Sequence, residues 1–179
     1  MRILRRIFHD TGGAEIAETA AVLPVLFTVL LAIFYFGRAY NIYGTINQAA
    51  MQGARAAVAP PCATCSGPPL TAAQIAANFV TPTLQASHLN PAQLQWPSPQ
   101  PAACACGSVG ACGTPVSCDA GELSVCVQQN IILNTTAGAH QECGTRVSFQ
   151  YPYNFNLPFN AFSLRMKAAA QMRTEDQTQ

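Results

Sequence analysis

Cysteine is the residue type in this chain with the clearest chemical potential. The sequence of 179 residues contains eight cysteines, and all of them follow residue 61. An even number of cysteines in a small exported domain is typical of a disulfide framework in an oxidising compartment. We therefore predict four intramolecular disulfides, without choosing the pairing, among Cys62, Cys65, Cys104, Cys106, Cys112, Cys118, Cys126 and Cys143.

A redox or metal role for these cysteines is the alternative. Cys62 and Cys65 have the spacing of thiol oxidoreductases, but prolines flank the pair and no basic residue lies nearby to favour a thiolate. A zinc site would add Cys104 and Cys106, but their spacing differs and 38 residues separate the two pairs. The sequence also lacks a haem-attachment motif, a glycine-rich phosphate loop and a Ser/His/Asp order. We predict no enzyme activity, no cofactor and no metal site.

Glu18 is the second chemically notable residue, because it stands at the head of an apolar segment. Nineteen uncharged residues, Thr19 to Gly37, separate it from Arg38, and about 20 apolar residues suffice for a helix to cross a bilayer. A carboxylate at this position is costly unless a partner charge meets it. Alternatively, Glu18 lies among the headgroups, where it stabilises the helix dipole. Pro24, inside the span, is expected to kink or loosen the helix.

The flanks of the span predict its orientation. Arg2, Arg5 and Arg6 precede it against a single Asp10, so the positive-inside rule keeps the N-terminus in the cytoplasm and exports the rest. A cleaved secretory signal peptide is disfavoured, because no small-residue cleavage site follows the apolar run at 35–40. We therefore predict a single-pass protein of a bacterial inner membrane.

Apolar and small residues continue beyond the span at spacings of three and four, which predicts an amphipathic helix with a small-residue face. Prolines at 60 and 61 end it. This divides the chain into a basic leader (1–13), a transmembrane and amphipathic helix (14–58) and an exported disulfide-rich α+β domain (59–179). The continuing pattern comprises Ile42, Tyr43, Ile46, Ala49, Ala50, Gly53, Ala54, Ala57 and Val58.

The exported domain combines a short helix with three strands. Thr71 is the predicted N-cap of a helix from Ala72 to about Val80 that Pro82 ends. Alternating apolar residues then predict strands near 123–133, with a bulge, and near 146–151 and 162–168. Each strand has one apolar and one polar face, so we expect an antiparallel sheet whose single buried face packs on the small residues of the long helix. The predicted fold class is α+β.

Gly13 follows a basic leader, and a glutamate, Glu18, lies five residues later at the head of a membrane helix. This arrangement resembles a type IV prepilin, which implies a pilin-like fold. On that resemblance cleavage follows Gly13, Ala14 becomes the N-terminus, and Glu18 pairs with the free amine of a neighbouring subunit. If the leader is retained, the chain is instead an uncleaved membrane anchor that carries an exported binding domain.

More narrowly, the N-terminal region is similar to the TadE-like family, pseudopilin-type proteins of the tight-adherence pilus and secretion system. The similarity rests on Gly13 with Glu18, Leu23-Pro24, Phe36-Gly37-Arg38 and Gly53-Ala54-Arg55, and near the C-terminus on Tyr151-Pro152-Tyr153 and Met172-Arg173-Thr174-Glu175. It implies a structural or assembly subunit of such a system. The implied partners are a prepilin peptidase, other pilin-like subunits, inner-membrane pilus assembly proteins and membrane lipid.

A nucleic-acid partner is not expected, because no Lys or Arg occurs from Ala56 to Thr145 and the exported domain therefore lacks a basic footprint there.

Overall fold

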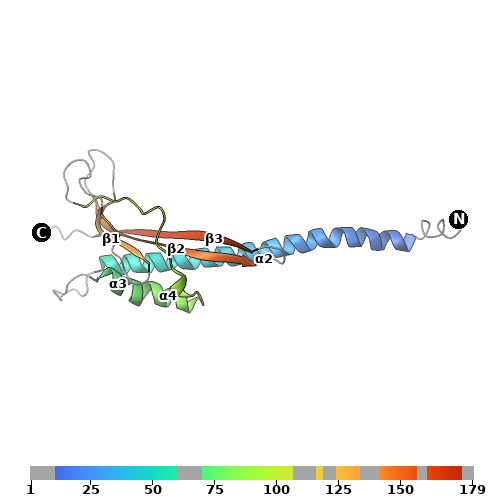
Figure 1. Ribbon diagram of the computed structural model, residues 1–179, viewed down its shortest axis with the longest axis horizontal. Helices are drawn as coiled ribbons and strands as arrows, with labels where there is room; N and C mark the ends of the chain where they lie inside the picture. The colour runs from blue at the N-terminus through green and yellow to red at the C-terminus, as the bar shows by residue number, and fades with distance from the viewer. Residues whose placement is uncertain are drawn as a thin grey trace. The chain divides into compact units, whose positions relative to one another are not determined.

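The protein combines one long helix with a small three-stranded antiparallel sheet, as the computed structural model shows (Figure 1). The structure describes residues 11–59, 70–106, 116–118, 124–133, 142–156 and 161–174. The predicted α+β class is confirmed.

Helix α2 (Thr11–Val58) contributes to two compact units, residues 1–40 and residues 41–179. In the first unit its side chains are almost all exposed, whereas in the second unit the same helix carries part of the core. The helix ends at Val58, as predicted, and Ala59 N still donates a hydrogen bond to Arg55 O at 3.0 Å.

A short helical run begins at a capping box. Gln74 N donates to the Thr71 hydroxyl at 3.3 Å, and Thr71 N donates to the side-chain oxygen of Gln74 at 2.9 Å, so two donors at the helix start are satisfied. The run contains α3 (Ala72–Ile75), a π-helical turn η1 (Ala76–Val80) and α4 (Thr81–Ala86). The predicted N-cap is confirmed.

The prediction that Pro82 ends this helix is wrong. Thr81 N donates to Ala76 O across the wider π turn, and Pro82 then lies in the first turn of α4. The first N–H groups of a helix have no intrahelical acceptor, so a proline there removes no bond. A 3-10 turn, η2 (Pro91–Gln93), follows.

The sheet has the order β1-β2-β3 and is antiparallel throughout. Its strands are β1 (Cys126–Ile132), β2 (Cys143–Asn156) and β3 (Ala161–Arg173). The predicted bulge is present, because the β1–β2 register shifts between Gln128 and Ile131. Asn130, inside it, has φ of 53°, a left-handed conformation that asparagine tolerates well.

One face of the sheet packs against the small residues of α2, as expected. A Cβ atom at Gly53 would lie 3.4 Å from Val147 Cγ1 of β2 and 3.1 Å from Val80 Cγ2 of η1. A side chain at this position would therefore require the valines to move by a few tenths of an ångström. Ile46, Ala49, Ala50 and Ala54 are fully buried around it, while Tyr43, predicted on the same face, is 50% exposed.

The other face of the sheet was expected to meet solvent, and this expectation is wrong for β1 and β2. Gln128, Ser148 and Gln150 are buried although they alternate with the apolar residues. Residues 95–101 and 116–118 bond to side chains or backbone on this side of the two strands. The side-chain nitrogens of Gln128 and Gln150 therefore have hydrogen-bond partners in this buried layer, whereas Gln128 Oε1 and Ser148 Oγ are buried with no partner among the described residues.

Candidate processing and assembly site

The predicted processing bond, between Gly13 and Ala14, lies within the first turns of α2, which begins at Thr11. Gly13 is exposed, and no heavy atom would lie within 4 Å of a Cβ placed there. Helix ends fray readily because their terminal groups lack intrahelical partners. A peptidase acting after Gly13 would therefore have to unwind about one helical turn.

Glu18 is exposed one turn after Glu15, on the same side of the helix. Among the residues that the structure describes, neither carboxylate has an ion-pair partner. The Thr19 hydroxyl donates to the backbone oxygen of Glu15 at 2.9 Å and so leaves both carboxylates free. The charge of Glu18 is thus available to a cation from outside the described chain.

The apolar segment after Glu18 has no cover from its own chain. Among the described residues, α2 is the one helix long and apolar enough, by length and composition, to cross a membrane. Its large exposed side chains in this segment include Val22, Leu23, Val25, Leu26, Phe27, Val29, Leu30, Ile33, Phe34 and Phe36. Such a surface requires lipid or other apolar helices as its surroundings.

Pro24 lies within this segment, and α2 continues across it. Because proline has no N–H, the carbonyl of Ala20 loses its usual partner four residues later. Thr28 nearby donates its hydroxyl hydrogen to Val25 O at 2.7 Å. The predicted kink or loosening stays a prediction.

Two disulfides join cysteines that the structure describes, and the predicted total of four stays a prediction. Cys106 is bonded to Cys143 and Cys118 to Cys126, with Cα–Cα distances of 5.7 and 4.9 Å. Cys104 is also disulfide-bonded. The remaining three, Cys62, Cys65 and Cys112, lie outside the described residues, and so does the predicted thiol pair at 62 and 65.

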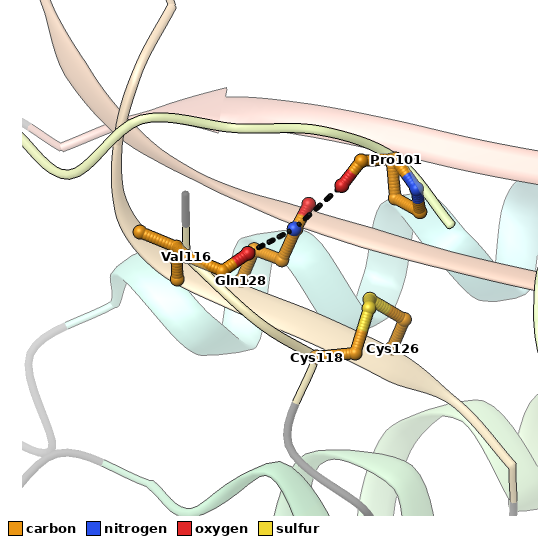
Figure 2. The surroundings of a disulfide bond; sticks show 5 residues. All are labelled: Pro101, Val116, Cys118, Cys126 and Gln128. Carbon is orange, nitrogen blue, oxygen red and sulfur yellow. Dashed lines mark hydrogen bonds between the residues drawn. A yellow bond between two sulfur atoms is a disulfide. The ribbon is translucent and has the colours of Figure 1, made fainter. Parts of the chain in front are cut away.

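Buried glutamines, together with the disulfides, attach residues 95–101 and 116–118 to the sheet. Figure 2 shows Gln128 between two backbone carbonyls: its side-chain nitrogen donates to Pro101 O at 2.9 Å and to Val116 O at 2.8 Å, beside the Cys118–Cys126 bond. Gln150 repeats the arrangement by donating to Ser98 O at 2.9 Å. Both amides thus replace water at carbonyls that the fold has buried.

Backbone pairing completes this attachment. Gln95 and Gln150 exchange two N–H···O bonds of 2.9 Å, and Cys106 N donates to Asn130 O at 2.7 Å. Sequence reasoning missed the role of Gln128 and Gln150, because a glutamine at every second position of a strand also fits a solvent-facing side. The nearby cysteines were the available signal that this side is covered.

The described arrangement around the sheet consists of cross-links. Within the part of the chain that the structure describes, no group of three or more His, Cys, Asp or Glu side chains could hold a metal ion. Four of the described cysteines form the two disulfides given above, and Cys104 is also disulfide-bonded.

A comparison with known families matches the N-terminal region. The model of the family described as TadE-like protein matches residues 13–55, which include Gly13, Glu18 and Pro24 and end at Arg55. No curated protein and no solved structure matches the chain. Residues 13–55 are therefore similar to the TadE-like family, as the resemblance predicted.

Proposed function

We propose that this protein is a pseudopilin-like structural or assembly subunit of a tight-adherence pilus or a related secretion system. The observation that carries the proposal is the match of residues 13–55 to the TadE-like family, with Glu18 at the head of an apolar helix that its own chain leaves uncovered. The proposed role involves no catalysis.

Packing of α2 against the helices of other subunits is the proposed mechanism of assembly. The large apolar side chains between Glu18 and Arg38 would then meet lipid in the isolated subunit and neighbouring helices in the assembly. Cleavage after Gly13 would give Ala14 a free amine, which carries a positive charge at neutral pH. That amine, on an adjacent subunit, is the proposed partner of Glu18.

The proposed setting follows from these roles. A prepilin peptidase removes residues 1–13, the span holds the subunit in the bacterial inner membrane, and the disulfide-bonded domain lies on the exported side. Other pilin-like subunits and inner-membrane assembly proteins are the proposed partners.

The N-terminal residue of the protein recovered from bacterial membranes tests processing directly. Intact mass and N-terminal peptide sequencing are expected to identify Ala14 as the first residue. Recovery of Met1 instead would remove the amine that Glu18 requires and would favour an uncleaved anchor with an exported binding domain.

A pair of substitutions tests the role of Glu18. Glu18→Ala is expected to leave membrane insertion intact and to reduce co-purification with partner subunits at least about tenfold, a change worth roughly 1.4 kcal/mol. Glu15→Ala, one turn away, removes the same charge from the same helix face and serves as the matched control. Equal co-purification of the two variants would contradict a specific pairing at Glu18.

A further inference from the structure

The far end of the β2–β3 hairpin exposes apolar side chains. We call Tyr153–Phe155 together with Ala161–Leu164 the hairpin tip. Phe162 and Leu164 are 55% and 51% exposed there, and they pair in register with Phe155 and Tyr153. Met166 and Ala168 continue the same row and are buried, so the apolar face of β3 extends beyond the core that it helps to form.

Two aromatic side chains of β2 pack against each other next to this surface. The rings of Tyr153 and Phe155 meet edge to face with centroids 4.2 Å apart. Tyr153 is buried and Phe155 half-buried. These rings belong to β2, the central strand of the sheet. Phe162 and Leu164 belong to β3, which is an edge strand, so an external surface can reach them.

All charged residues of the β2–β3 hairpin are basic. From Cys143 to Thr174 the sequence contains no Asp or Glu and four cations. Arg173 is paired with Glu142 at 3.2 Å at the opposite end of β3. Arg165 and Lys167, next to the tip, are exposed and have no ion-pair partner among the described residues. Two cations that no described carboxylate neutralises therefore lie beside the tip, on the opposite face of β3 from Phe162 and Leu164.

The hairpin also lies at a particular end of its unit. Val147 of β2 is beside Gly53 of α2, and from there the hairpin runs along α2 toward its Asn41 end rather than toward Val58 (Figure 1). Asn41 is the first residue of the second unit, three residues after Arg38 closes the apolar segment. The tip thus belongs to the end of the unit that the chain joins directly to the span.

We infer that the hairpin tip binds the surface of the lipid bilayer that α2 crosses. Phe162 and Leu164 enter the interfacial region, where aromatic and apolar residues with flanking cations are favoured. Arg165 and Lys167 meet anionic headgroups, which attract basic side chains near such a surface. The span makes this binding intramolecular, so few side chains suffice. The inference requires the span but not cleavage after Gly13.

Brominated lipids test the inference on the full-length chain, held as one copy per lipid nanodisc. Trp96→Phe first removes the single tryptophan. Phe162→Trp in that background places a probe in the tip, and Gln171→Trp, exposed on the same strand nine residues along, is the control. Acyl-chain bromination is expected to quench the probe at 162 at least about twofold and to leave the probe at 171 unchanged.

Lipid composition and charge variants complete the test. Quenching at 162 is expected to be stronger in nanodiscs with phosphatidylglycerol than in those of phosphatidylcholine alone, and Arg165→Gln with Lys167→Gln is expected to abolish that difference. Free-thiol counting on each denatured variant checks that the disulfides have formed. Equal quenching at 162 and 171, or none at 162, would overturn the inference. Quenching only in discs with several copies would assign the tip to a contact between subunits instead.

Discussion

The two parts of α2 share one backbone conformation and have opposite surroundings. Ile33, in the apolar segment, is 65% exposed, whereas Ile46, thirteen residues later in the same helix, is fully buried. The difference shows that helical structure here does not depend on which environment covers the helix. What changes is the cover: this chain's own sheet packs on the second part, whereas no described residue of the chain covers the first.

The two parts of α2 also differ in the size of their apolar residues. The apolar segment uses large side chains such as Leu26, Phe27 and Phe34, which gain most from transfer out of water. The part beneath the sheet uses Ala49, Ala50, Gly53 and Ala54, because a strand can approach a helix closely only over small residues. The first part of α2 is distinguished by the hydrophobicity of its large side chains, and the second part by the small size of its residues.

The largest expected effect comes from truncating an isoleucine in each part. Ile46→Ala should lower the free energy of unfolding of the exported domain by about 2–5 kcal/mol, because it leaves a cavity in the core. Ile33→Ala removes the same atoms from an exposed position and should leave that free energy unchanged. Urea unfolding of the full chain in detergent, followed by the fluorescence of Trp96, measures both. Equal effects would show that the two parts are not distinct.

A smaller effect is expected from filling a glycine. Gly53→Leu should destabilise the exported domain by about 1–3 kcal/mol, since Val80 and Val147 already lie within 3.4 Å of a Cβ at this position and the core would be overpacked. Gly44→Leu, in the same part of the helix, meets open space and should stabilise the helix by a few tenths of a kcal/mol or more. Thermal unfolding of the two variants gives opposite shifts if size governs this face.

The smallest of the three effects concerns the opposite face of the sheet. Gln128→Ala leaves the buried carbonyls of Pro101 and Val116 without this donor and should cost about 1–2 kcal/mol. Gln171→Ala, on an exposed position of β3, is the control and should change little. The urea midpoints of the two variants compare them, and a shift no larger than the control's would mean that water replaces the amide without loss.

Much of this fold was predictable because its signals are local. The uncharged run from Thr19 to Gly37, the Thr71 cap and the bulge after Gln128 each depend on a few neighbouring residues, and the structure contains all three. The glutamines of the sheet were misjudged, because burial of Gln128 and Gln150 depends on a segment that is distant in sequence. Pro82 was misjudged because a π turn, which has no clear sequence signal, precedes it.

The residues of the candidate site also differ in whether local sequence signals could predict them. Gly13, Glu18 and Pro24 were predicted from spacing along one helix, and the family match covers these positions, while their roles stay predictions. The pairing of Cys106 with Cys143 and of Cys118 with Cys126 was not, since spacing among eight cysteines does not select partners. Only the tertiary arrangement, which joins the cysteine-rich segment to the starts of β1 and β2, determines it.

That pairing has a consequence for biosynthesis. The two bonds are nested: Cys118 and Cys126 are 8 residues apart and lie within the 37 residues that separate Cys106 from Cys143. In the proposed orientation the exported chain emerges from the span outward, so both members of the inner pair reach the oxidising side before Cys143 does. Closing the inner bond first removes two competing thiols before the partner of Cys106 arrives. Cys106 itself emerges before both of them, so the native pairing requires it to stay unpaired, or to exchange an earlier bond, until Cys143 arrives.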